Sequence, residues 1–330
     1  MVYVRAGAWR CGAQLLVVAV ATAGLLAVPI FTASADRAIA PTVRGNGAGP
    51  GPGAALSFAG PDAEQNAMPF PAPARTGLAQ AAVTAAERAA GGATEVAVAV
   101  LDREVGEMVV GTRGDTPVHT ASLSKVVVAV DIVDRRRLDG LAVSAADVDL
   151  LRRALGASDD GAMNQLWGRF DGPGAASRVS RRAGLTATSK PSDPSQWGEM
   201  SMSATDTVRV WEYILEDLPA ADRDLLISAM NAAPARAKDG FDQTFGLLAP
   251  VVDGPGGPGS VAKQGWMCCP TGHRYLHSAG AVGPEQRFVV ALLTLTPRRS
   301  SGESARAEVT AIAAATVRAL SLTGAGFDGR

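Results

Sequence analysis

The sequence predicts an α/β (α+β) domain: a five-stranded antiparallel sheet flanked by terminal helices, with an inserted helical domain beside it. Three observations support this fold class. Two strand-like runs lie early in the chain and three lie late, alanine-rich helical segments bracket them, and the region between is rich in helix signals. Strands from both chain ends can then meet in one sheet, with the terminal helices on one face and the helical block beside it.

The expected elements follow in order. A helix spans about 76–90, and the runs EVAVAVLD (95–102) and GEMVVGTR (106–113) form a strand pair. The helical domain covers about 122–233, where Ser144-x-x-Asp147 and Ser203-x-x-Asp206 are predicted capping boxes. Three strands follow at VAKQGWMCC (261–269), RYLHSAGAV (274–282) and RFVVALLTLT (287–296), and a helix at about 303–321 closes the domain.

The N-terminal region reads as an export segment. Arg5 and Arg10 precede an apolar stretch, 15–31, which is followed by a small-residue cleavage pattern at 33–35. We predict a signal peptide or membrane anchor at 1–35, a disordered Gly/Pro/Ala-rich linker at 36–74, and a folded domain at 75–330. Cys11 precedes the apolar stretch, which does not suit a lipid-acceptor cysteine. The protein is expected to be secreted or in the cell envelope.

The charge balance excludes a global electrostatic preference. The chain has 31 Lys and Arg against 32 Asp and Glu, a formal net charge of −1. No field therefore favours nucleic acid or anionic lipid, and membrane contact is expected only through the N-terminal segment. The expected partner is a small-molecule or cell-wall peptide substrate, bound by a monomer without a cofactor.

A candidate nucleophile lies at the start of the valine-rich segment HTASLSKVVVAV, 119–130. In Ser122-Leu123-Ser124-Lys125 the spacing places hydroxyl and amine on one helix face, one turn apart. A lysine whose pKa is lowered by burial can take the serine proton, and a helix N-terminus favours developing negative charge. These features suit acyl transfer, whereas the structural alternative is that Ser122 only caps a helix.

Two further motifs follow in the expected order. Ser158-Asp159-Asp160 closes the helix that begins after Ser144, and Lys263-Gln264-Gly265 opens the first late strand. With Ser-x-x-Lys, these motifs resemble the penicillin-recognising serine enzymes, most closely class A β-lactamases, which carry Ser-Asp-Asn and Lys-Thr-Gly at these places. The segments 144–167 and 201–215 are similar as well, and the resemblance covers roughly 75–322.

The resemblance implies a role for each matched position. Ser122 would be the acylated nucleophile and Lys125 its proton acceptor, Ser158 would relay a proton to the leaving nitrogen, and Lys263 would hold Ser158 and a substrate carboxylate. The N–H groups of Ser122 and Trp266 would form the oxyanion hole. The substrate would also contact the strand positions Gln264 and Gly265.

Several positions depart from that pattern. Asp160 replaces an asparagine, and an ionised carboxylate can hold Lys125 but repels a substrate carbonyl. Gln264 replaces a threonine. The region of the hydrolytic glutamate reads SKPSDPSQWGEM (189–200), so Asp193 or Glu199 is the candidate for activating water, and Trp197 stands where an asparagine is expected. The short connection between Ser122 and Ser158 implies a more open cleft.

Other chemistry-bearing residues have weaker support. His119 lies close to Ser122 but no Gly-x-Ser-x-Gly elbow is present, and the spacing of His273 and His277 in a strand does not suit a metal site. Cys268-Cys269 is read as two free thiols on alternate strand faces, with a strained disulfide as the alternative. Arg135–Arg137 is read as helix-terminal charge.

The sequence therefore predicts an exported serine acyl-hydrolase that acts through an acyl-enzyme on a β-lactam or related cell-wall amide. Two alternatives stay open. One is a D-alanyl peptidase or esterase with poor lactam turnover, because the Glu-x-x-x-Asn pattern is missing. The other is a non-catalytic envelope binding protein that retains the fold.

Overall fold

The computed structural model of the chain describes residues 76–252 and 260–321. The predicted export segment at 1–35 and linker at 36–74 lie outside the described residues. Within the described part of the chain, no helix is both long enough and apolar enough to cross a membrane.

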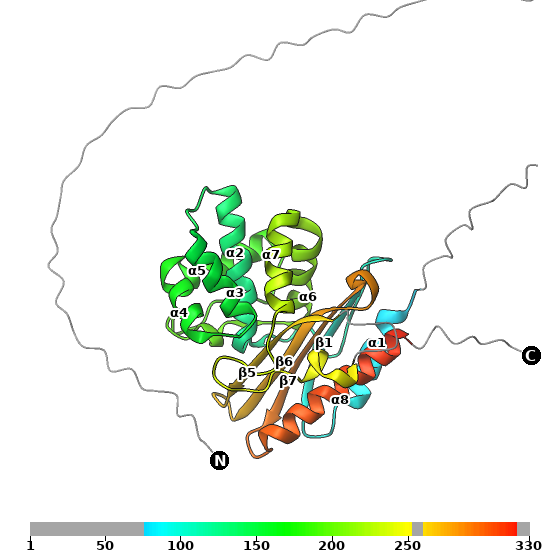
Figure 1. The fold of residues 1–330 in the computed structure, drawn as a ribbon. Coiled ribbons are helices and arrows are strands. Elements are labelled where there is room, and N and C mark those ends of the chain that lie inside the picture. The colour runs from blue at the N-terminus through cyan, green and yellow to red at the C-terminus, as the bar shows by residue number, and fades with distance from the viewer. Residues whose placement is uncertain (1–75, 253–259, 322–330) are drawn as a thin grey trace, which may run out of the picture. The chain divides into compact units, whose positions relative to one another are not determined.

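Figure 1 shows the helices and strands of the described chain. The α-helices are α1 Leu78–Ala89, α2 Ser124–Leu138, α3 Ala145–Leu155, α4 Asp160–Arg169, α5 Gly172–Ala183, α6 Ala204–Glu212, α7 Ala220–Asn231 and α8 Gly302–Ser321. The strands are β1 Glu95–Asp102, β2 Glu107–Val110, β3 Val118–His119, β4 Ser201–Met202, β5 Val261–Cys268, β6 His273–Val282 and β7 Phe288–Pro297. Short helical turns that bear on the site are η1 Ala121–Leu123, η2 Trp197–Glu199 and η4 Gly246–Leu248.

The main sheet joins the two ends of the domain. Its strand order is β2-β1-β7-β6-β5, and all four pairings are antiparallel. β1, from the beginning of the domain, therefore pairs with β7 from its end, as the sequence predicts. β5 lies at the edge of the sheet, and in Figure 1 this edge lies nearest the helical group of α2 to α5.

Strand alternation divides the core into two layers. In β1, Val96, Val98 and Val100 face the packed pair α1 and α8, whereas Ala97, Ala99 and Leu101 face the helical domain. Figure 1 shows α1 and α8 side by side on one face of the sheet. Since both faces are covered, β1 is apolar along almost its whole length.

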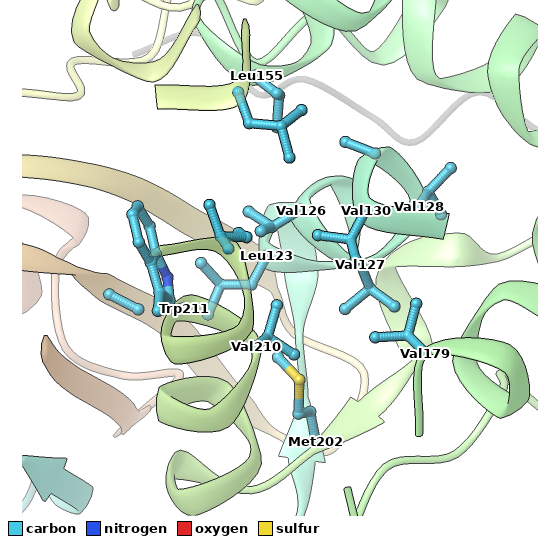
Figure 2. Close-up of a cluster of buried hydrophobic side chains, with 14 of the residues drawn as sticks. Leu123, Val126, Val127, Val128, Val130, Leu155, Val179, Met202, Val210 and Trp211 are labelled. Carbon is cyan, nitrogen blue, oxygen red and sulfur yellow. The ribbon is translucent and has the colours of Figure 1, made fainter. Parts of the chain in front are cut away.

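α2 lies in the centre of the helical domain. Its segment Val126–Val130 is fully buried, and Figure 2 shows these valines packed among side chains from α3, α5, β4 and α6. The buried Asp131 of α2 is neutralised by Arg178 through two hydrogen bonds of 2.7 Å. Burial on all sides fixes the position of α2, and with it the position of the residues in its first turn.

The fold class predicted from the sequence is confirmed, and the strand boundaries agree closely except that β2 ends at Val110. Ser144 and Asp147 form the predicted capping box. The second capping box is wrong in part. Ser203 accepts a hydrogen bond from the Asp206 N–H at 3.0 Å, but the Asp206 carboxylate bonds the segment 186–188 instead of returning to Ser203.

Candidate active site

The segment that carries Ser122 is held in an uncommon backbone conformation where β3 leads into η1 and α2. The N–H of Thr120 donates to the carbonyl of Met200 at 2.7 Å, which ties the segment to β4. Ala121 has φ 47°, in the left-handed region that residues other than glycine rarely adopt. Ser122 therefore emerges from a tethered turn, not from a regular helix start.

Ser122 and Lys125 form a buried pair at the start of α2. The Nζ atom of Lys125 lies 2.8 Å from the Oγ atom of Ser122, as the i to i+3 spacing predicts. Ser122 is 5% exposed and Lys125 is 1% exposed. The pair is thus almost withdrawn from water, which differs from the open cleft expected from the short connection between Ser122 and Ser158. The reason is that η2 packs directly on η1.

Ser158 connects this pair to a second lysine. Lys125 donates to the carbonyl of Ser158 at 3.0 Å and lies 3.1 Å from its hydroxyl, while Lys263 of β5 lies 2.9 Å from the same hydroxyl. Ser158 has φ 51°, a left-handed conformation. Lys263 is fully buried, so the alternative that it is an exposed strand residue is wrong.

The two carboxylates after Ser158 have different surroundings. Asp159 caps α4 by accepting from the N–H of Ala162 at 3.1 Å, and it also pairs with Arg153. Asp160 instead accepts from Lys125 Nζ at 2.6 Å, and its side chain is 61% exposed. These contacts define a buried cluster of Ser122, Lys125, Ser158, Lys263 and Asp160. Asp160 is its acidic member, and most of the Asp160 side chain is open to water.

The oxygen atoms around Lys125 restrict how its protons can be arranged. The carbonyl of Ser158 and the carboxylate of Asp160 only accept, so each takes one N–H of Lys125. An ammonium has a third N–H to donate, whereas a neutral amine has a lone pair instead. In the neutral form that lone pair is free for the hydroxyl of Ser122, which is the geometry of a general base.

Burial and charge adjust the basicity of both lysines. Burial lowers the pKa of Lys125, and the carboxylate of Asp160 opposes this shift. Burial lowers the pKa of Lys263 well below its usual range, and the charge of Lys125 lowers it further. Because both amines contact the Ser158 hydroxyl, protonation of one disfavours protonation of the other. A state with one neutral amine is favoured, and proton transfer from Ser122 requires that this neutral amine be Lys125.

Trp197 of η2 covers the cluster on one side. Its ring lies 4.6 Å from Lys125 Nζ, and its indole N–H donates to Oδ1 of Asn164 at 2.8 Å. The Trp197 side chain therefore lies directly beside the amine that contacts Ser122. Apart from Asp160, no carboxylate among the described residues is hydrogen-bonded to the cluster.

A second aromatic wall comes from β5 and the loop before it. The Trp266 ring lies 5.5 Å from Lys263 Nζ and stacks on Phe241 with a centroid distance of 4.7 Å. Its indole N–H donates to Asp239 at 3.0 Å. Gly265 is required here because a Cβ atom would lie 2.9 Å from the carbonyl of Thr120. Trp266 and Gly265 thus lie beside the Ser122 segment.

Three residues proposed from the sequence do not join the cluster. The Asp193 carboxylate is exposed and accepts from the N–H and hydroxyl of Ser195, both at 2.8 Å. The Glu199 carboxylate has no hydrogen bond or ion pair to any described residue. The Gln264 amide is buried and donates to the carbonyls of Phe245 and, at 3.4 Å, Gln243. Gln264 therefore holds the loop before η4 and is not presented to a substrate.

The histidines do not form a serine–histidine triad. His119 bonds the carbonyl of Glu199 at 3.0 Å, and no described hydrogen bond joins it to Ser122. His277 is buried in β6, where its Nδ1 accepts from the Thr294 N–H at 3.1 Å and its Nε2 donates to the His119 carbonyl at 2.8 Å. His277 is thus a neutral residue that positions the segment leading to Ser122.

Comparison with known proteins places the chain in a family. No family model matches it. It is 35% identical over 229 residues to "Putative lipoprotein LppW" of Mycobacterium tuberculosis, covering 68% of this chain and 69% of the relative. The same protein of Mycobacterium bovis matches to the same extent. The chain belongs to the LppW family.

Solved structures identify the fold of this LppW-family protein. A class A β-lactamase of Bacteroides cellulosilyticus matches with a TM-score of 0.60 at 14% identity, over 75% of this chain and 99% of that one. A β-lactamase of Chitinophaga pinensis matches with a TM-score of 0.58 at 15% identity, over 75% of this chain and 99% of that one. The fold is that of class A β-lactamases, and at this identity the likeness concerns the fold alone.

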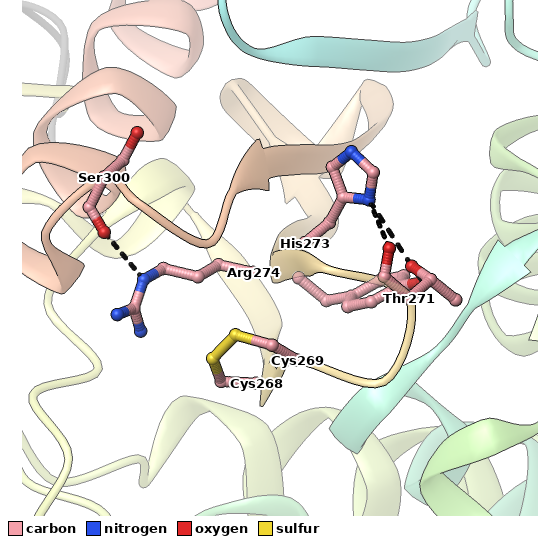
Figure 3. Close-up of a disulfide and its surroundings, with 7 residues drawn as sticks. Cys268, Cys269, Thr271, His273, Arg274 and Ser300 are labelled. Carbon is pink, nitrogen blue, oxygen red and sulfur yellow. Dashed lines mark hydrogen bonds between the residues drawn. A yellow bond between two sulfur atoms is a disulfide. The ribbon is translucent and has the colours of Figure 1, made fainter.

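The LppW-family chain joins Cys268 and Cys269 in a disulfide (Figure 3). The expectation of two free thiols on alternate strand faces is therefore wrong. β5 ends at Cys268, so Cys269 already belongs to the turn before β6. The disulfide lies two residues beyond Trp266, near the hydrogen bond between Arg274 and the carbonyl of Ser300.

Sequence reasoning missed several residues of the site. Asp239 and Phe241 lie in a loop without periodic pattern, and their contact with Trp266 depends on the fold. The role of His277 was missed because a single histidine in an apolar strand has no sequence signature. Among the described residues, no group of three or more His, Cys, Asp or Glu side chains is arranged to hold a metal ion.

Proposed function

We propose that the protein is a serine acyl-hydrolase of the cell envelope that forms a covalent acyl-enzyme on Ser122. The observation that carries the proposal is the buried contact of 2.8 Å between Lys125 Nζ and Ser122 Oγ. Lys125 also has two fixed acceptors for its other N–H groups and a lowered pKa. An amine held in this way can remove the proton of a serine at neutral pH.

Acylation would use the whole chain of hydrogen bonds. Ser122 Oγ attacks the carbonyl carbon as its proton moves to Lys125, and the Ser158 hydroxyl passes a proton to the leaving nitrogen or oxygen. Lys125, which lies 3.1 Å from the Ser158 hydroxyl, returns the Ser122 proton to it, while Lys263 holds that hydroxyl in place. The N–H groups of Ser122 and Trp266 are the proposed donors to the oxyanion. The substrate is a β-lactam or a related cell-wall amide.

The arrangement around Trp197 favours a slow second step. Hydrolysis of the acyl-enzyme needs a water beside the ester and a base to activate it. Trp197 lies over Lys125, and Asp193 and Glu199 are both outside the cluster. This observation favours the second candidate function, a D-alanyl peptidase or esterase with poor lactam turnover, over an efficient β-lactamase.

The envelope location rests on two observations. The N-terminal 35 residues have the pattern of an export segment. The relative of M. tuberculosis carries the name "Putative lipoprotein LppW", and lipoproteins are a class of envelope protein. We extend that location to this chain as part of the proposal.

Intact mass measurement tests the proposed function. The purified protein is incubated with a fluorescent penicillin and with a D-alanyl thioester, beside the Ser122→Ala variant. The expected result is an adduct of one acyl group that persists for many minutes and is absent from the variant. An equal adduct in the variant, or no adduct with either probe, would overturn the proposal and leave a non-catalytic binding protein with this fold.

A further inference from the structure

The cluster is flanked by carboxylates that are open to solvent. Asp160 uses one oxygen on Lys125, and its other oxygen has no hydrogen bond to a described residue. Asp239, from a different segment, is exposed; it accepts from Trp266 Nε1 at 3.0 Å and from the N–H of Phe241 at 2.9 Å. Ionised carboxylates accept hydrogen bonds and cannot donate them. A substrate group placed beside them must be a donor.

The basic residues of the cluster offer little positive charge to an anionic substrate. Lys125 and Lys263 are both buried, and burial lowers the pKa of each. Lys263 is further committed to the Ser158 hydroxyl and to the carbonyl of Gln264 at 2.8 Å. No arginine is hydrogen-bonded to the cluster among the described residues. A negatively charged group of the acyl part, placed beside Asp160, would therefore meet two exposed carboxylates and two shielded amines.

We infer that the acyl group transferred to Ser122 carries an ammonium close to the reacting carbonyl, and that Asp160 binds this ammonium. The inference rests on the proposed acyl-enzyme function and names its substrate class: acyl donors with a free amine, such as unblocked amino-acyl or peptidyl amides. Asp160 is suited to the role because it is two hydrogen bonds away from Ser122 Oγ, through Lys125. Asp239 contributes its charge at longer range.

The reaction with such a donor is a balanced acyl transfer. Ser122 Oγ forms a bond to the carbonyl carbon while the bond from that carbon to the leaving amine breaks. The serine proton ends on the leaving nitrogen. Water later cleaves the ester, releasing an amino acid and restoring the proton to Ser122. The ammonium takes no part in the bond changes and serves only for binding.

Three kinds of matched probe, each prepared in two configurations, test the inference. They are the 4-nitroanilides of alanine, in both configurations, with a free amine, an N-acetyl group or an N-succinyl group, used at a pH where the amine is protonated. The rate of the first turnover is measured from 4-nitroaniline release, and the Ser122 adduct from intact mass. We expect the ammonium probe to react at least about 10-fold faster than the acetyl probe, since hydrogen bonds to charged groups contribute about 1.5–3 kcal/mol. The succinyl probe should be slowest.

The Asp160→Asn variant is the decisive arm, with Asp149→Asn, which changes an exposed carboxylate of α3, as matched control. The ratio of ammonium to acetyl rates should fall to near one in Asp160→Asn and stay unchanged in Asp149→Asn. Because the ratio compares two probes on one protein, changes in Lys125 basicity or in the folded fraction cancel. A ratio near one in the unmodified protein, or one that Asp160→Asn does not alter, would overturn the inference while the proposed function stands. Absence of an adduct with these probes and with penicillin would overturn the proposed function first.

Discussion

The Ser122 cluster contains two lysines, and among the described residues only one carboxylate, that of Asp160, is in direct contact with either amine. With fewer carboxylates than amines, the cluster favours a state in which one of the two amines is neutral. Burial removes positive charge from the pair, and Asp160 restores part of it on Lys125. Asp160 therefore sets how readily Lys125 gives up a proton.

Asp160→Asn should shift the pH dependence of Ser122 acylation. The rate rises with pH as Lys125 loses its proton, and the negative charge of Asp160 holds that proton by raising the pKa of Lys125. Without the charge the pKa falls further, so the midpoint of the rise moves to lower pH. First-turnover rates measured across pH 5 to 10 with an uncharged ester probe check this. An unchanged midpoint would show that Lys125 is not the titrating base.

His277 makes the stability of the fold depend on pH. Burial lowers the pKa of His277 to about 4, against 6.5 for the free side chain. Between these pH values the unfolded chain binds a proton at this residue and the folded chain does not. The free energy of unfolding therefore decreases as the pH falls from about 6.5 to 4, and His277 causes no further decrease below that pH. The loss from this residue is roughly 3 kcal/mol.

His277→Gln should therefore flatten the pH dependence of unfolding between pH 6.5 and 4. Urea denaturation at several pH values measures it, and His273→Gln, at a partly exposed residue of the same strand, is the control. The control should retain the slope of the unmodified protein. Equal slopes in all three proteins would contradict the assignment.

At the scale of elements, η2 covers the turn that carries Ser122, the proposed nucleophile. It packs on η1, and its first residue, Trp197, lies over Lys125. Trp197→Ala should let water approach the ester on Ser122 and shorten the lifetime of the acyl-enzyme several-fold, with little change in its formation. The decay of adduct mass after removal of excess probe measures this. Gln196→Ala, an exposed neighbour, should leave the lifetime unchanged.

The pairing of β5 with β6 brings Lys263 to the cluster. Gly280 of β6 has no room for a side chain, because a Cβ atom would collide with the Val261 carbonyl and lie 2.6 Å from the Cα of Ala262. Gly280→Ala should lower the free energy of unfolding by about 1–3 kcal/mol or more and slow acylation. Gly168→Ala, in α4 with open space around it, should be neutral or stabilising by up to about 1 kcal/mol. Chemical denaturation compares the two variants.

At the scale of the molecule, the order of elements could be predicted because runs such as VAVAVL and FVVALLTL have clear strand character and are bounded by turn residues. The Ser-x-x-Lys spacing predicted the contact of Ser122 with Lys125, whereas the resemblance to class A β-lactamases implied that Ser158, Asp160 and Lys263 lie beside them. The same reasoning failed for Gln264, because strand pattern alone does not reveal that a loop carbonyl such as that of Phe245 competes for its amide. It failed for Asp239 because loop contacts depend on tertiary structure.

The site depends on both parts of the domain. Ser122, Lys125, Ser158 and Asp160 come from the helical part, whereas Lys263 and Trp266 come from the edge strand of the sheet. The Ser158 hydroxyl, with Lys125 on one side and Lys263 on the other, is the link between them. The account therefore requires that one serine, Ser122, be far more reactive than the other serines of the chain.

The most direct measurement maps where a covalent acyl group attaches. The protein, with Lys125→Ala and Ser122→Ala beside it, is treated with a fluorescent penicillin, digested, and the labelled peptide is sequenced by tandem mass spectrometry. The account predicts one labelled residue, Ser122, with labelling lost in Ser122→Ala and reduced at least about 100-fold in Lys125→Ala, the lower end of the contribution of a general base. Labelling at another residue, or full labelling without Lys125, would contradict it.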